Sequence, residues 1–513
     1  PMGPLSAPTL AAAAAALCAV LLHRLLAAAL RWRAASRPSL ARRALLARVA
    51  PSKHGFLPAV TPSFEFGNVL DAFVKVGERC RGTERAGKRG AARRPPPPTT
   101  PHPAQIADAV ADEYAKNDAA AFRAWLEAEL EGATSAASTA AALASLDGDA
   151  ARLALVPLVF LAHAHRWGAT APPPWVLAEE SWAPPRALAR ALDPLCALVG
   201  MQRTGSATLL FLRNWTLKGR EGGREYDPAE LTTQTVAPRF RFAAGALAAA
   251  ETAVLQSVVL TEAAATTTHL ALLDLFEAVA DDDADRATAA AASVAAGTRA
   301  NLSVFHAVFK QSNLSTTAWA VHLQPFYCAL TPGEHGVGGA QFPFVHASDA
   351  ALGVDAAADA LGGVVAANRG CLLPEERLFV AYLEAHSRPA RRWLARGGER
   401  AAQARRHWNG AVSALVAWRA THRARAAAYL APTVDAPSRG TTGGTAAYGG
   451  GVKEADGDGG GETPSTPTSV LDADATVAGF RALMDGRIAS TRRATVGEGG
   501  GMAALFAGAG ERV

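Results

Sequence analysis

The sequence predicts a mainly α-helical protein, in which a large helical domain follows a smaller N-terminal domain. Half of the 513 residues are hydrophobic, which is enough for a sizeable buried core. Ala dominates this apolar half, and Ala is the strongest helix former. Ile, which favours strands, is scarce, and aromatic residues make up only 7% of the chain. The length allows two or three domains.

Residues 1–50 differ in composition from the rest of the chain. They contain seven Arg and no Lys, Asp or Glu. A 14-residue apolar run from Thr9 to Leu22 stops at His23-Arg24, which is short for a membrane span and typical of a signal segment. We favour a leader that targets an organelle, either the mitochondrion or a plastid. A signal anchor, a secretory segment and a cytoplasmic location stay open.

The net charge of +5 comes from this leader, because its seven Arg leave the remaining residues at about −2. A nucleic-acid partner is therefore not expected, and a membrane could be contacted only through the leader. We expect a monomer. The five Cys are scattered without a C-x-x-C pair, so neither a zinc site nor a disulfide framework is predicted. This favours a reducing compartment.

Composition divides the chain into a leader and three further parts. Residues 51–187 are expected to form the small N-terminal domain, interrupted by a basic, proline-rich insert at 82–105. Residues 188–432 are expected to form the large helical domain. Residues 433–513 combine a Gly-rich loop over 433–468 with a short helix and a polar tail.

Hydrophobic spacing and turn residues predict the helices in order. The Pro-rich stretches at 171–174 and 183–185 mark loops between the first helices and the later ones. The helix expected over 398–429 carries Leu415, Trp418 and His422 at helical spacing. The expected helices cover residues 106–133, 150–167, 188–217, 239–262, 267–280, 284–309, 315–330, 347–366, 374–396, 398–429 and 471–488.

Local motifs indicate little chemistry. His163 and His165 are two residues apart on a predicted helix, so their side chains point away from each other and cannot share a metal ion. His386, His407 and His422 are separated singles, expected on the surface or in the core. No nucleotide-binding, hydrolase or zinc-protease motif occurs.

The segment Pro374-Glu375-Glu376-Arg377 has the composition of an ordinary helix start. Pro suits the first helical position, and acidic residues favour the positive end of the helix dipole. The two glutamates are adjacent, hence on different helix faces, and make a poor acid–base pair.

Several segments between residues 150 and 445 resemble the indoleamine 2,3-dioxygenase family, in the family's order. Their order and spacing along the chain carry the resemblance. The leader, the proline-rich insert and the tail show no resemblance. The matching segments are ARLALVPLVFLAHAHRWG, LFLRNWTLKG, FAAGALAAAETAV, HLQPFYCAL, HASDAALGVDAAADALGGV, PEERLFVAYLEAHSRPARRWLARGG, HWNGAVSALVAWRATHRARAAAYL and TTGGT.

The resemblance implies a helical domain that holds haem b between its helices, with a smaller N-terminal domain. It also implies a reaction, in which O2 opens the indole ring of L-tryptophan, or of another indole, to give N-formylkynurenine in the kynurenine pathway. Haem carries the difficult chemistry in such a reaction. The alternative is a non-catalytic relative that binds haem or an indole and has lost the proximal ligand.

Glu376 falls where the family has its proximal His, within the Pro374–Arg377 frame. A carboxylate is a harder, anionic ligand that favours ferric iron, so Glu376 puts dioxygenase activity in doubt. His386 is no substitute, because ten residues along a helix are about 15 Å. Cys371 lies before the helix start.

The resemblance places other residues around the haem and the substrate. Gln324 stands where the family has the Arg that binds the substrate carboxylate, and it lacks that charge. Ala243, next to Phe242, takes the place of an aromatic residue on the distal face. The remaining positions are Asp359 and Arg377 in the haem environment and Trp319, Ser348, Thr442 and Thr445 in the substrate pocket.

Overall fold

A computed structural model describes residues 54–79, 119–168, 182–220, 222–243, 247–310, 312–316, 318–331, 334–396, 398–430 and 473–497. The predictions for the leader, the insert at 82–105, the loop signal at 171–174 and the Gly-rich segment at 433–468 lie outside these residues. The described chain is mainly helical, which confirms the predicted fold class. The division into domains stays a prediction.

Most residues of α7 (Gly148–Trp167) are buried, because α3, α5 and α9 pack against it, and α6 packs against α9. Asp147 begins α7 by accepting a hydrogen bond from the backbone N–H of Ala150 at 2.8 Å. A capping box starts the preceding helix, in which the side chains of Ser135 and Ser138 each accept a hydrogen bond from the other's backbone N–H. The helices of this part are α3 (Leu70–Arg79), α5 (Ala119–Ala133), α6 (Ala136–Ala144), α7 (Gly148–Trp167) and α9 (Arg186–Val199).

The prediction of one long helix over 188–217 is wrong. α9 ends at Gly200, which has a left-handed backbone with φ +70°. Gly205 is also left-handed, and a Cβ there would lie 2.7 Å from a methyl group of Val159. A π-helical turn η1 (Thr208–Leu212) and a short strand β1 (Trp215–Leu217) follow. β1 pairs antiparallel with β2 (Val236–Pro238), so that Thr216 faces Ala237; the 3-10 turn η2 (Pro228–Glu230) lies between them.

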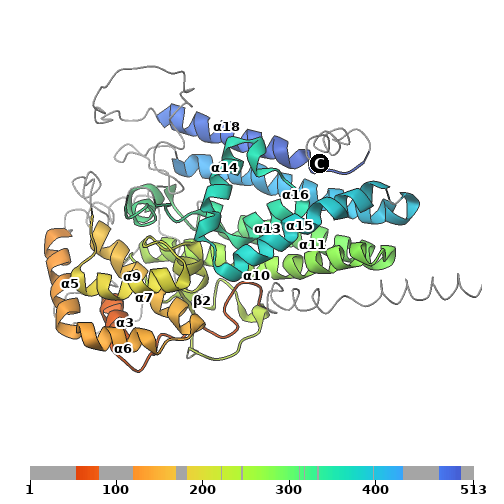
Figure 1. Ribbon diagram of the computed structural model, residues 1–513. Helices are drawn as coiled ribbons and strands as arrows, with labels where there is room; N and C mark the ends of the chain where they lie inside the picture. The colour runs from red at the N-terminus through yellow and green to blue at the C-terminus, as the bar shows by residue number, and fades with distance from the viewer. Residues whose placement is uncertain are drawn as a thin grey trace, which may run out of the picture.

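The helices predicted over 239–262 and 267–280 are one helix, α10 (Leu247–Ala280), and residues 239–243 are not helical. α10 is the one described helix long and apolar enough to cross a membrane, yet 78% of its most apolar window is buried inside the protein. It packs against α11 (Ala284–Val308), which in turn packs against α16 (Gly398–Leu430). These three helices form the long layer in Figure 1, from which α18 (Ala473–Arg492) extends the stack.

Shorter elements connect α11 to the last long helices. The helix predicted over 315–330 is a π-helical turn η3 (Ala318–Leu323) followed by the single turn α12 (Gln324–Phe326). The helix predicted over 347–366 is two helices, α13 (Pro343–Leu352) and α14 (Ala360–Ala367), because Gly353 is left-handed and ends the first. Three 3-10 turns flank these two helices: η4 (Gly339–Gln341), η5 (Ala356–Ala358) and η6 (Asn368–Cys371). The helix predicted over 374–396 is confirmed as α15 (Pro374–Arg396).

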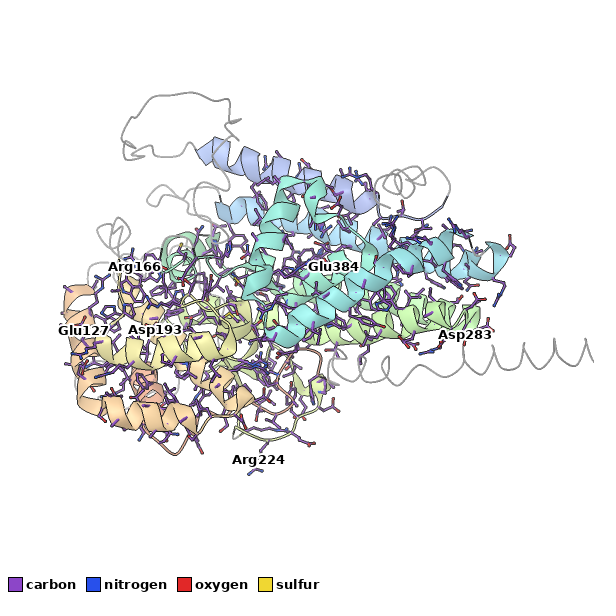
Figure 2. All side chains as sticks on the ribbon, in the orientation of Figure 1. Glu127, Arg166, Asp193, Arg224, Asp283 and Glu384 are labelled. Carbon is purple, nitrogen blue, oxygen red and sulfur yellow. The ribbon has the colours of Figure 1, made fainter. Side chains whose placement is uncertain are left out.

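Side chains fill the space between these helices, and exposed charges such as Glu127 and Asp283 lie at opposite ends of the molecule (Figure 2). The buried apolar residues form two large clusters. One extends from Leu57 to Tyr429 and includes the first half of α10, and the other includes its second half together with α15 and α16. α10 therefore connects the two clusters.

Candidate functional site

A cavity of about 210 Å³ lies where α10, α16 and α18 face η3 and η4. Its wall is mostly apolar, and α10 contributes Val254, Ser257 and Val258. Such a hollow favours a flat aromatic molecule. We call it the aromatic cavity, and its aromatic lining consists of Phe211, Phe305, Phe309, Trp319, Tyr327, Phe342, Trp418, Tyr429 and Phe480.

Trp418 and His422 form one wall of the aromatic cavity. They are one turn apart on α16, and their rings stack with centroids 5.4 Å apart and planes at 4°. Burial, helped by the charge of Arg419, lowers the pKa of His422 to about 4, so its imidazole is neutral at pH 7. Within the described part of the chain His422 has no hydrogen bond, although it borders the cavity. It offers a neutral nitrogen ligand or acceptor.

A buried ionic network closes one end of the aromatic cavity. Asp349 of α13 pairs with both Arg419 of α16 and Arg487 of α18; the distance to Arg487 is 2.5 Å. Arg487 also contacts Asp359 at 3.1 Å. The network joins four helices, and because each guanidinium already has a carboxylate partner, it adds little free charge to the cavity.

Glu376, the position predicted for the iron ligand, does not line the aromatic cavity. Its carboxylate accepts a hydrogen bond from the backbone N–H of Leu373 at 2.7 Å and from the Thr208 hydroxyl at 3.1 Å. The first contact is the one that a glutamate in the third helical position makes to cap a helix. Burial raises the pKa of Glu376 to about 7, although the nearby charge of Arg213 opposes this.

The neighbours of Glu376 also have structural partners. Glu375 forms an ion pair with Arg152 at 2.8 Å. Arg377 donates to the carbonyl oxygens of Gly370 and Leu372, at 3.2 and 2.6 Å, and so holds the turn before α15. The ordinary helix-start interpretation accounts for the contacts of Glu376 to Leu373 and of Arg377 to the preceding turn, whereas Glu375 forms a tertiary ion pair with α7.

The predicted substrate residues do not gather in one place. Trp319 lines the aromatic cavity, where its ring lies 6.0 Å from that of Tyr327. Gln324 does not line it; its side chain is fully buried, and neither amide atom has a hydrogen-bond partner among the described residues. Ser348 is buried in α13, also outside the lining. Thr442 and Thr445 lie outside the described residues.

The positions predicted near the haem are likewise dispersed. Ala243 is buried, and its N–H, like that of Phe242, donates to the carboxylate of Glu251 at 2.6 and 2.9 Å. The Phe242 ring stacks between Phe160 and Phe326. Asp359 caps α14 through the N–H of Gly362 at 2.8 Å and belongs to the ionic network. Neither Ala243 nor Asp359 lines the aromatic cavity.

Sequence reasoning did not identify the residues that do form the cavity wall beside α18. His422 was expected as an ordinary surface or core residue, and Arg419 and Arg487 were not singled out. One signal was available, because Leu415, Trp418 and His422 follow a helical spacing that places a tryptophan and a histidine on one face. No comparable pattern in the sequence predicts that α18 packs against α16 beside this face.

Among the described residues no group of three or more His, Cys, Asp or Glu side chains is arranged to hold a metal ion. A haem iron needs only one such side chain from the protein. In comparisons with known proteins, no protein-family model matches the chain and no curated protein matches it.

Proposed function

We propose that the protein is a divergent relative of the indoleamine 2,3-dioxygenases that binds an indole-type molecule in the aromatic cavity. One observation carries this proposal: the aromatic cavity is lined by Trp319, a residue that the resemblance expects in the substrate pocket, and by Val254 and Trp418, which lie in matching segments. The volume of about 210 Å³ is below the range of about 300–1,000 Å³ of drug-sized sites. A single bicyclic ring suits this space.

The charges around the cavity favour a neutral ligand. Arg419 and Arg487 are both paired with Asp349, and Gln324 lies outside the lining. The ammonium and carboxylate groups of tryptophan would therefore lose water without gaining a free charged partner. Indole itself is the expected ligand, ahead of tryptophan.

Calorimetric titration of the full chain with indole and with L-tryptophan tests this proposal. Indole should bind more tightly than tryptophan. Ala426→Phe, which fills the lining from α16, should abolish indole binding, whereas Ala417→Phe on an exposed position of the same helix should leave it unchanged. Absence of indole binding to the natural chain, or equal losses in the two variants, would rule the proposal out.

Haem-dependent opening of the indole ring is the second candidate function. The neutral His422 imidazole suits the iron of haem, whereas both guanidinium groups of the lining are already paired with Asp349 and are not free for the haem carboxylates. The volume does not suit a group much larger than indole, so the cavity must widen, and Met484 of α18 is its most adaptable side chain. Bound haem would supply O2 binding and electron transfer. Glu376, hydrogen-bonded outside the lining, is poorly placed to hold it.

The absorption spectrum of the protein titrated with haemin distinguishes the two possible ligands. If His422 holds the iron, His422→Ala should lose the spectral shift of an imidazole complex, and Glu376→Gln should retain it. The reverse result would support Glu376 as the ligand position. No shift with the natural chain would eliminate this second function while leaving indole binding to be decided by calorimetry.

A further inference from the structure

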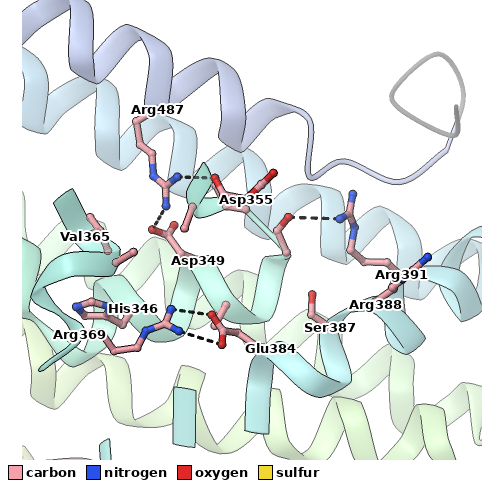
Figure 3. Close-up of a pocket in the computed structure, with 15 residues that line it drawn as sticks. His346, Asp349, Asp355, Val365, Arg369, Glu384, Ser387, Arg388, Arg391 and Arg487 are labelled. Atoms are coloured by element: carbon pink, nitrogen blue, oxygen red, sulfur yellow. Dashed lines mark hydrogen bonds and ion pairs between the residues drawn. The ribbon is translucent and has the colours of Figure 1, made fainter. Parts of the chain in front are cut away.

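An open pocket of about 510 Å³ lies between α13, α14, α15 and α18, separate from the main volume of the aromatic cavity (Figure 3). Its volume falls in the range of about 300–1,000 Å³ that is usual for small-molecule sites. Four arginines and three carboxylates line it, so the lining has one net positive charge; His346 is neutral there because burial lowers its pKa to about 4. We call it the arginine pocket.

Two of the four arginines are neutralised within the pocket wall. Arg369 forms a two-pronged pair with Glu384, at 2.7 and 3.0 Å, and Arg487 is paired with Asp349. The remaining two, Arg388 and Arg391, have no carboxylate partner among the described residues. The third carboxylate, Asp355, is engaged in capping a turn through the N–H of Ala357 at 2.8 Å. This contact leaves the Asp355 carboxylate charged, so the lining keeps one net positive charge, and Arg388 and Arg391 are its arginines without a carboxylate partner.

The hydrogen-bonding groups beside these arginines are also unsatisfied. Ser387 is 3% exposed, and its hydroxyl has no hydrogen-bond partner in the described structure. Arg391 Nε has none either, and its other nitrogens make only long contacts, at 3.4 and 3.3 Å, with the carbonyl oxygens of Gly353 and Arg493. Buried donors without partners destabilise a fold unless a ligand or water satisfies them.

Backbone geometry brings the Ser387 hydroxyl and the Arg391 guanidinium together. The residues are one turn apart on α15, hence on one face of the helix. Both pack against Gly353, where a Cβ would lie 2.9 Å from Ser387 Oγ and 2.8 Å from Arg391 Nη1. A Cβ would force these groups to shift, and the left-handed φ of +69° at Gly353 favours glycine in any case. Figure 3 shows Ser387, Arg388 and Arg391 along the α15 side of the pocket.

We propose that the arginine pocket binds the phosphate group of a small phosphate monoester through Ser387, Arg388 and Arg391. A phosphate monoester has three terminal oxygens and a charge of about −1.5 to −2 at neutral pH, which matches one hydroxyl and two unpaired guanidinium groups. A carboxylate has only two oxygens and one charge. The space beyond the phosphate accommodates the organic part of the ester. This site is independent of the indole proposal.

Calorimetry on the full chain at constant ionic strength, with glycerol 3-phosphate and with inorganic phosphate, tests the proposal. Both should bind, and acetate should bind more weakly. Arg391→Gln removes a charge-assisted contact and should weaken binding about tenfold or more. Ser387→Ala should also weaken it, and this variant changes no charge. Arg392→Gln is the matched control, because Arg392 is exposed on the same helix and does not line the pocket.

The proposal is overturned if glycerol 3-phosphate gives no more heat than chloride at the same ionic strength. It is equally overturned if Arg392→Gln weakens binding as much as Arg391→Gln, because binding would then follow overall charge. Thermal unfolding followed by circular dichroism establishes that each variant is folded. If Arg391→Gln does not fold, Ser387→Ala and Arg388→Gln decide the question, and unchanged binding in both contradicts the proposal.

Discussion

Glu262, Glu376 and His269 are fully buried ionisable residues near the interface of α10 and α15. Glu262 accepts one hydrogen bond, from the N–H of Phe344 at 3.2 Å, while its other oxygen lies 3.8 Å from a His269 nitrogen. Burial, together with the charge of Glu376, raises the pKa of Glu262 to about 8, and burial lowers that of His269 to about 3. Burial disfavours the charged form of each of these three groups.

Glu262 should make the protein less stable as the pH rises. Below about pH 4.5 the carboxyl is protonated in both the folded and the unfolded chain. Between about pH 4.5 and 8 only the unfolded chain loses the proton, so the free energy of unfolding falls by up to about 1.4 kcal/mol per pH unit. Glu262→Gln should remove this decline. Urea unfolding at about pH 5 and pH 8 measures it, and an identical pH dependence in both chains would contradict the prediction.

Glu376→Ala should destabilise the protein by about 1–2 kcal/mol, because it leaves the Leu373 N–H and the Thr208 hydroxyl without their acceptor. Glu375→Ala is the neighbouring control. Its partly exposed ion pair with Arg152 contributes less than about 1 kcal/mol. Urea unfolding of both variants gives the comparison, and a larger loss from Glu375→Ala would show that the Glu376 contacts contribute little.

At the scale of elements, Asp349 holds α13, α16 and α18 together through Arg419 and Arg487. Asp349→Asn leaves two buried guanidinium groups without their shared partner and should cost about 3–5 kcal/mol. Asp274→Asn, at the exposed pair with Arg286, should cost less than about 1 kcal/mol. Chemical unfolding compares the two, and equal losses would mean that the network stabilises no more than a surface pair.

The elements with strong local signals were predicted closely. α15 has a Pro and two acidic residues at its start, and α11 begins after the capping residue Asp283, so both start where the sequence indicated. The segment after Val199 was predicted wrongly as helix. Left-handed glycines and packing against Val159 end the helix there. The cavity wall was also not predicted, because it depends on long-range docking of α18 through Asp349, which no local pattern encodes.

At the scale of the whole molecule, α10 belongs to both apolar clusters, and a break in its middle should weaken both. Ala264→Pro removes a backbone hydrogen bond and should cost about 3 kcal/mol or more. Ala264→Gly, which keeps the bond, should cost about 1 kcal/mol. Thermal unfolding followed by helical circular dichroism measures both. A proline variant as stable as the glycine variant would show that the clusters do not depend on the continuity of α10.

Arg487 borders the aromatic cavity and the arginine pocket at once. A ligand that repositions this side chain in one hollow changes the wall of the other. The two occupancies are then coupled by a single free energy, which is the same whichever ligand binds first. A phosphate ester that raises the affinity for an aromatic ligand by some factor must have its own affinity raised by that same factor. If both proposed ligands bind and each shifts Arg487, binding in one hollow changes the affinity of the other by the same factor in both directions.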